Sequence, residues 1–355
     1  MANTRLFIHI GTHKTGTTAI QNALLANRRR LKRAGIVYMP VPPGHSSLKN
    51  AEEPHEAAVD RFRRFLGDAL SRNGVQENDG STVVLSWEGL SGSLNLGYTN
   101  AEAVAGNLHS ALESFELETS IIVYLRRQDR FVESVYSQKV HEGSALTFKE
   151  FLSALPEGAF DWLDLIAAYA DYFGRHNVTP RAYGDFGKPA HLVEDFCRNI
   201  GVRPSGPSGV VIDQAREVPN RSYSPAALEV LRICNSELDE NDRRALRRLL
   251  KKHAAKTDED ATALWLPVER AEFMKRFEQS NRKIARDHPD LESCLQFKGA
   301  PASCGKGPSV PQNEDVVVSL ARTLLSVGRE SRRSGLASAG TGLVNLARRI
   351  LTLNR

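Results

Sequence analysis

The chain has 355 residues, of which 41% are hydrophobic and 25% charged, as in a globular protein with a buried core. Its net charge of +5 comes from the last 35 residues, where seven arginines and one glutamate give +6 and leave −1 for the rest. A body without excess basic charge argues against nucleic-acid binding. No apolar stretch approaches the roughly 20 residues that span a bilayer, and no signal peptide is recognisable. The four cysteines show no C-x-x-C spacing. We therefore expect a cytoplasmic protein without disulfides or a zinc site.

Short apolar runs alternate with longer amphipathic patterns over the first 200 residues. We expect strands at 6–10, 36–39, 82–86, 120–125 and 178–183, and helices at 18–33, 57–72, 101–115, 161–174 and 189–200. This alternation predicts βαβ units around a central, mainly parallel sheet. From 224 to 287 the pattern is helical throughout, with Ser224-Pro225 as its start signal. The predicted fold is α/β, a three-layer sandwich with a helical C-terminal region.

We expect one domain over 1–298, in which 224–290 is the all-helical part. Residues 299–315 are rich in Gly, Pro and Ser and are predicted to form a linker. Residues 316–355 form a basic tail, whose end places an apolar stripe on one helical face: Leu343, Leu346, Ala347, Ile350 and Leu351. Such a helix docks on anionic lipid at the inner membrane face, packs on its own domain or a second subunit, or is poorly ordered. We favour the last two over peripheral membrane contact.

The first strand runs into a Gly/Thr-rich loop, in "RLFIHIGTHKTGTT". From Gly11 it reads G-x-x-x-x-G-T-T, close to the phosphate loop G-x-x-x-x-G-K-[ST], with Lys14 inside the loop and Thr17 at the usual place of the lysine. Backbone N–H groups and the positive end of the following helix favour a bound phosphate. Lys14 adds a positive charge, and hydroxyl donors come from Thr15, Thr17 and Thr18. We interpret the segment as P-loop-like and phosphate-binding rather than as a plain turn.

A second anion site is expected after strand 120–125, in "YLRRQDRFVESVY". Arg126 ends the strand and Ser134 lies on the helix that follows. A guanidinium and a hydroxyl that converge there would bind an anion, since Arg offers a planar fork of donors. Taken alone, the segment is explained more simply as an arginine cluster paired with Asp129 and Glu133 on a helix face.

Together the two segments resemble the sulfotransferases, and "TGTTAIQNAL" and "NRSYSPAALEVLR" are similar to their bacterial branch, so the resemblance covers about residues 5–290. The family uses 3′-phosphoadenosine 5′-phosphosulfate (PAPS) as sulfuryl donor. The resemblance implies that the first loop holds the 5′-phosphosulfate and that Arg126 and Ser134 hold the 3′-phosphate. The loop residues concerned are Lys14, Thr15, Gly16, Thr17 and Thr18.

The segments that contact adenine in the family are less well matched. Small-molecule sulfotransferases carry a tryptophan directly after G-T-T, where this chain has Ala19. Tyr183 resembles the family's strand-end tyrosine near the adenine, although its usual acidic follower is replaced by Gly184. The C-terminal R-K-G motif has only a poor match at Lys298-Gly299.

The third segment is "VVLSWEGL", where Glu88 follows a strand end at the same edge of the sheet. An acceptor hydroxyl loses its proton as it attacks sulfur, so a carboxylate in reach is a candidate general base. Polysaccharide sulfotransferases also use a glutamate after this strand, which supports the assignment. We favour this role over that of an ordinary loop or helix-capping glutamate, and His13 and His45 are the rival bases.

These segments predict transfer of a sulfuryl group to a hydroxyl, with a carbohydrate or glycolipid as the expected acceptor. Lys14 would neutralise charge on the departing phosphate. A sulfuryl group carries less charge than a phosphoryl group, so we expect no metal. The first alternative is a P-loop small-molecule kinase, which Thr17 disfavours because a lysine is needed there. The second alternative is a non-catalytic nucleotide-binding or membrane-docking module.

Overall fold

The computed structural model describes residues 3–41, 48, 55–76, 78–184, 189–202, 223–236, 238–253 and 263–297. The described residues fall into two compact units, each of which is described by itself. The first holds the described residues of 1–128, 155–217 and 276–297, and the second holds those of 129–154 and 218–275. The predicted linker, the basic tail, His45 and the Lys298-Gly299 match all lie outside the described residues.

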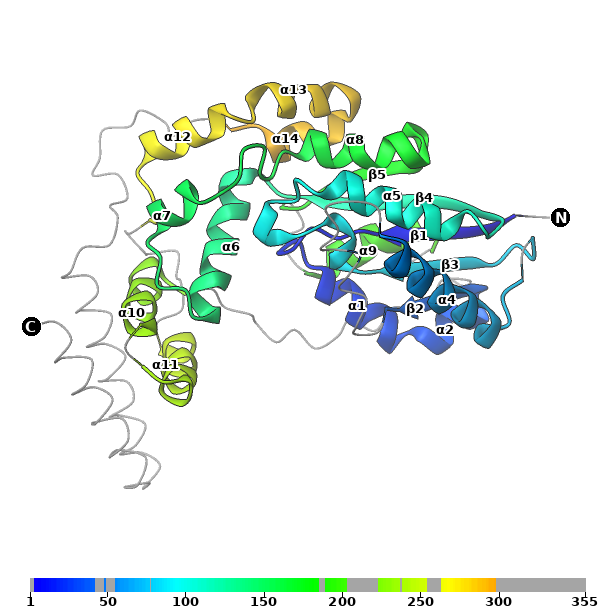
Figure 1. Ribbon diagram of the computed structural model, residues 1–355, viewed down its shortest axis with the longest axis horizontal. Coiled ribbons are helices and arrows are strands. Elements are labelled where there is room, and N and C mark those ends of the chain that lie inside the picture. Colours follow the sequence, from blue (N-terminus) through cyan, green and yellow to red (C-terminus); the bar gives the residue numbers. More distant parts are fainter. Residues whose placement is uncertain are drawn as a thin grey trace, which may run out of the picture. The chain divides into compact units, whose positions relative to one another are not determined.

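The first unit is built on a parallel sheet of five described strands in the order β2-β3-β1-β4-β5 (Figure 1). The strands are β1 (Thr4–His9), β2 (Ile36–Pro40), β3 (Thr82–Ser86), β4 (Leu117–Leu125) and β5 (Val178–Ala182). The three central strands β3, β1 and β4 carry side chains that are buried on both faces of the sheet. Continuous apolar runs are typical of such strands, and the predicted α/β fold with a parallel sheet is confirmed.

One face of the sheet is covered by α1 (Thr17–Ala26), α2 (Arg28–Arg33) and α9 (Pro189–Asn199). Their apolar side chains form one core with Tyr38, Val84, Ile122 and Tyr124 from the strands. A single helix was expected over 18–33, but Asn27 divides it. The Asn27 side chain donates a hydrogen bond of 2.9 Å to the Ala23 carbonyl, one of the last carbonyl groups of α1. The apolar periodicity of the sequence runs on through this position, although α1 ends at Ala26.

The opposite face carries α4 (Glu56–Asn73), α5 (Ala101–Leu112) and α8 (Trp162–Phe173). These helices pack on one another, and α8 also contacts β4 and β5. With helices on both faces, the first unit is a three-layer sandwich. The short helix η3 (Arg175–Asn177) leads from α8 into β5.

The sheet has a topological switch point between β1 and β3. After β1 the chain turns into α1 on one face, whereas after β3 it passes through η1 (Glu88–Ser91) and η2 (Leu94–Leu96) to α5 on the other. Neighbouring strands whose connections leave in opposite directions open a crevice at their carboxyl ends, where ligands bind in open α/β sheets. The Gly/Thr loop and Glu88 therefore lie on the two sides of the place where such a crevice is expected.

A segment from late in the chain returns to the first unit. It comprises α13 (Glu278–Asp287), η4 (Pro289–Leu291) and α14 (Glu292–Leu295). Gln128, just beyond β4, and Asn281 of α13 form a reciprocal, buried amide pair with hydrogen bonds of 2.9 and 3.0 Å. This pair fixes α13 beside the carboxyl end of β4.

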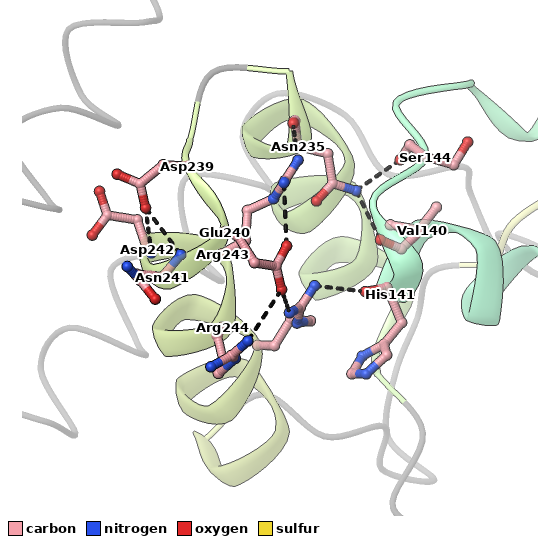
Figure 2. A network of polar contacts seen from close by, with 11 residues as sticks. Val140, His141, Ser144, Asn235, Asp239, Glu240, Asn241, Asp242, Arg243 and Arg244 are labelled. Carbon is pink, nitrogen blue, oxygen red and sulfur yellow. Dashed lines mark hydrogen bonds and ion pairs between the residues drawn. The ribbon is translucent and has the colours of Figure 1, made fainter.

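The described part of the second unit is helical. It holds α6 (Gln128–Glu142) from Asp129 onward, α7 (Phe148–Ser153), α10 (Pro225–Asn235), α11 (Glu240–His253) and α12 (Pro267–Lys275). The Asn235 amide donates to the carbonyls of Val140 and Ser144, and Glu240 pairs with Arg243 and other arginines of its own helix (Figure 2). Among the described residues, no helix combines the length and the hydropathy needed to cross a membrane.

Candidate functional site

The loop after β1 contains two residues whose backbone is in the left-handed conformation. Lys14 has a φ of 62° and Gly16 a φ of 79°. A Cβ on Gly16 would overlap the Leu192 side chain and lie 3.3 Å from the Tyr183 ring, so only glycine fits there. The first turn of α1 begins at Thr17 and contains no acidic residue. The loop therefore ends on a positive helix terminus that favours an anion.

The loop threonines divide into two groups. Thr12 donates to the Tyr124 carbonyl at 2.8 Å and Thr15 donates to the Thr12 carbonyl at 2.6 Å, and both are fully buried. These hydroxyls shape the loop from within. Thr18 is exposed at the helix start, whereas Thr17 is buried with no hydrogen-bond partner for its hydroxyl among the described residues. Lys14, which lies between Thr12 and Thr15 in the sequence, is half-buried.

Glu88 lies beside the loop at the carboxyl edge of the sheet, as expected from its position after β3. Its carboxylate Oε2 is 3.9 Å from His13 Nε2, and the two side chains are 33% and 17% exposed. His13 follows β1 and Glu88 follows β3, so the contact connects the ends of two neighbouring strands. The structure thus brings two of the candidate bases, Glu88 and His13, into one pair.

Tyr98 fixes the orientation of His13. Its hydroxyl oxygen accepts from the His13 backbone N–H at 2.9 Å and lies 2.8 Å from His13 Nδ1. Burial raises the pKa of Tyr98 far above its ordinary value, so the phenol keeps its proton and can donate it to Nδ1. In that arrangement the imidazole proton is on Nε2, the ring nitrogen that lies nearest to the Glu88 carboxylate.

Arg126 and Tyr183 lie at the carboxyl ends of β4 and β5. The Arg126 guanidinium is 5.7 Å from the centroid of the Tyr183 ring, within range of a cation–π interaction. The Tyr183 backbone N–H donates to the Leu125 carbonyl at 2.7 Å. Because the same ring lies beside Gly16, it brings the end of the loop near the arginine.

Ser134 lies on α6 within the second unit, while Arg126 belongs to the first. The expected convergence of these two residues on one anion therefore stays a prediction. His45, the other rival base, lies outside the described residues.

Two residues of the site were not predicted from the sequence. Tyr98 is 85 positions from its partner His13 and has a left-handed φ of 68°, and no local pattern marks it. His9 is a polar residue at the end of an apolar strand and is buried completely. The sequence signal that could have indicated His9 is a polar residue at the last position of an otherwise apolar, buried strand.

Comparison with known proteins adds little to this geometry. No family model matches the chain, and no curated protein matches it either. One solved structure, a sulfotransferase from Alicyclobacillus acidocaldarius, aligns with 69% of this chain and 100% of its own, at 17% identity and a TM-score of 0.38. A likeness at this level establishes neither a shared fold nor a shared function. The function has to be inferred from the residues of the site.

Proposed function

We propose that the chain is a sulfotransferase that moves a sulfuryl group from PAPS to an acceptor hydroxyl, with a carbohydrate or glycolipid as the acceptor. The observation that carries the proposal is the pairing of a phosphate-type loop after β1 with a carboxylate after β3, linked by the 3.9 Å approach of His13 and Glu88. A binding loop and a base on two sides of one crevice are what an attack on a bound anhydride requires.

The loop supplies the part of the site that favours negative charge. The terminus of α1, the Lys14 ammonium and the hydroxyls of Thr17 and Thr18 are all groups that bind phosphosulfate oxygens. Arg126, next to the aromatic ring of Tyr183, fits the 3′-phosphate and base end of the nucleotide. Ser134 is proposed as a second donor to that phosphate.

Glu88 acts on the acceptor. Its carboxylate takes the proton of the acceptor hydroxyl as the oxygen–sulfur bond forms, while the bond from sulfur to the 5′-phosphate oxygen breaks. The electron pair of that bond stays on the phosphate, where Lys14 neutralises the added charge. His13, in the orientation that Tyr98 fixes, places its Nε2 3.9 Å from the Glu88 carboxylate, which is too long for a hydrogen bond but within the range of a charge interaction.

The test is transfer of labelled sulfate from PAPS to a panel of glycan and glycolipid acceptors. Glu88→Gln keeps the shape of the side chain and removes the base, so transfer should fall about 100-fold or more, in the range of general-base catalysis. Binding of adenosine 3′,5′-bisphosphate to this variant should remain unchanged. His13→Asn should lower transfer less, because the base itself remains. Full transfer by Glu88→Gln would remove Glu88 from its role, and donor binding without transfer by the wild type would favour the non-catalytic module.

A further inference from the structure

The spacing of His13 and Glu88 suits a third polar atom between them. The 3.9 Å from His13 Nε2 to Glu88 Oε2 exceeds a direct hydrogen bond, which spans about 2.7–3.2 Å. An oxygen about 2.8 Å from each atom fits this gap, with an angle of about 90° between its two hydrogen bonds. Polar groups at such a separation are commonly bridged by one oxygen. Both side chains are partly exposed, so a ligand can reach them.

A buried serine connects the two sides of the gap. The Ser91 hydroxyl lies 2.9 Å from the carbonyl of Glu88 and 3.3 Å from the carbonyl of Gly11, the first residue of the loop. Ser91 is fully buried, so both contacts are shielded from water. The loop that carries His13 and the turn that carries Glu88 are therefore held together through one hydroxyl.

Tyr98 fixes the histidine side of the gap. Its ring is buried, with centroids 5.8 Å from Phe160 and 6.2 Å from Trp162. Its hydroxyl lies 2.9 Å from the backbone nitrogen of His13 and 2.8 Å from Nδ1 of the same residue. The imidazole is thus held through its backbone and through Nδ1, which makes Nε2 the ring nitrogen at the gap.

Two effects place the imidazole proton of His13 on Nε2. Burial raises the pKa of Tyr98 far above its ordinary value, so the phenol keeps its proton. The Ser91 hydroxyl also lies beside the Tyr98 oxygen, but an imidazole nitrogen is the stronger acceptor, and the phenol therefore donates to Nδ1. In addition, a lone pair on Nε2 would be repelled by the Glu88 carboxylate, whereas an N–H is attracted to it.

We propose that the oxygen in this gap is the acceptor oxygen, that His13 donates a hydrogen bond to it, and that His13 thereby selects a hydroxyl over an amine. Tyr98 is the positioning residue that sets the ring. The inference rests on the proposed function for the reaction itself. It adds to that function the place of the acceptor atom and the chemical class of acceptor that the site takes.

The selection follows from the number of lone pairs on the attacking atom. A hydroxyl oxygen accepts from His13 Nε2–H with one lone pair and attacks sulfur with the other, while its proton passes to Glu88. The oxygen–sulfur bond forms as the bond from sulfur to the 5′-phosphate oxygen breaks, and His13 keeps its own proton. A neutral amine has one lone pair, so its attack on sulfur leaves the Nε2–H without an acceptor, at the cost of a lost hydrogen bond.

The first experiment needs no nucleotide. Long-range ¹H–¹⁵N correlation spectra of the histidine-labelled full chain report the tautomer of His13 at pH 8, with His13→Asn to assign its signals. The expected result is a proton on Nε2 and none on Nδ1. In Tyr98→Phe, which lacks the donor to Nδ1, a population with the proton on Nδ1 should appear. A proton on Nδ1 in the wild type overturns the proposal.

The second experiment measures transfer of labelled sulfate from PAPS to trifluoroethanol and to trifluoroethylamine, two small probes that differ in the attacking atom. This amine is largely unprotonated at pH 8, so both probes offer a lone pair. His13→Asn removes the donor at the Nε2 position and should lower transfer to the alcohol about tenfold, the scale of one hydrogen bond. Transfer to the amine should not fall, so the alcohol-to-amine ratio should drop about tenfold. Release of sulfate to water, a second oxygen acceptor, should fall in parallel with transfer to the alcohol.

The matched control is His13→Gln, whose longer side chain can place an amide N–H near the Nε2 position. It should retain most of the alcohol transfer and most of the ratio. Equal losses for alcohol and amine in His13→Asn, with unchanged binding of adenosine 3′,5′-bisphosphate, would overturn the proposal. If the wild-type chain binds the bisphosphate but releases sulfate to neither probe nor water, the proposed function fails and the acceptor role of His13 fails with it. The tautomer measurement then still shows whether Tyr98 sets the ring.

Discussion

Acid should destabilise the first unit through His9, and the size of the effect follows from its burial. In the folded chain the pKa of His9 is lowered to about 3 from its ordinary value of 6.5, because the ring is taken out of water. Below pH 6.5 the unfolded chain therefore binds a proton that the folded chain does not. Stability falls as pH decreases wherever the unfolded state binds more protons.

Each unit of pKa difference corresponds to about 1.4 kcal/mol, so His9 should cost about 2 kcal/mol of stability between pH 6.5 and pH 5. The loss continues toward pH 3 and stops where the folded ring also titrates. Asp79 acts at lower pH, because hydrogen bonds from Gln76 and Ser81 lower the pKa of its carboxyl to about 2. Its contribution is lost only below about pH 4 and so falls outside the window from pH 5 to 7, in which His9 acts.

The assay is urea unfolding at pH 5, 6 and 7, followed by circular dichroism, for the wild type and for His9→Asn. The variant should be less stable at pH 7, since it loses ring packing. Its stability should decrease less between pH 7 and pH 5, by about 2 kcal/mol, because Asn does not titrate. Equal decreases in the two proteins would show that His9 is solvated or charged in the folded chain, and the reasoning about its burial would be refuted.

Three further substitutions test the geometry of the loop and its support. Lys14→Gly should raise the melting temperature, by relieving about 1 kcal/mol of left-handed strain at φ 62°, and should abolish sulfuryl transfer in the same preparation. Gly16→Ala should destabilise the chain by about 1–3 kcal/mol in thermal unfolding, because a Cβ at φ 79° would also overlap Leu192; an unchanged melting temperature would contradict the loop conformation. Asn281→Ala should cost about 1–3 kcal/mol by leaving the buried Gln128 amide unpaired, and replacing both residues with leucine should cost less than the sum of the single losses.

The sheet could be predicted from the sequence because buried parallel strands read as short apolar runs. The expected strand 82–86 and the observed β3 coincide, and β5 ends one residue before its expected end. The expected helix 18–33 was too long because helical periodicity does not record that Asn27 turns its side chain back to cap α1. Helix ends are decided by such local hydrogen bonds rather than by the hydrophobic pattern.

The part of the candidate site that lies directly after the strands could be predicted from the sequence. The loop that holds His13 and the turn that holds Glu88 each follow a strand, and parallel strands bring their carboxyl ends to one edge. The approach of these two segments could therefore be expected before the structure. The orientation of His13 could not, because it depends on Tyr98, which reaches the loop from η2 through a left-handed turn. That His9 and Thr17 both lie close to Gly11 could not be predicted either, because three-dimensional packing alone supplies that information.

Calorimetry with two nucleotides tests the central claim, that the loop after β1 serves a sulfuryl donor rather than a triphosphate. The account predicts that adenosine 3′,5′-bisphosphate binds without any metal, that Arg126→Gln weakens this binding, and that ATP with Mg²⁺ does not compete. Tight binding of ATP with Mg²⁺, together with no binding of the bisphosphate, would contradict the account and favour the kinase.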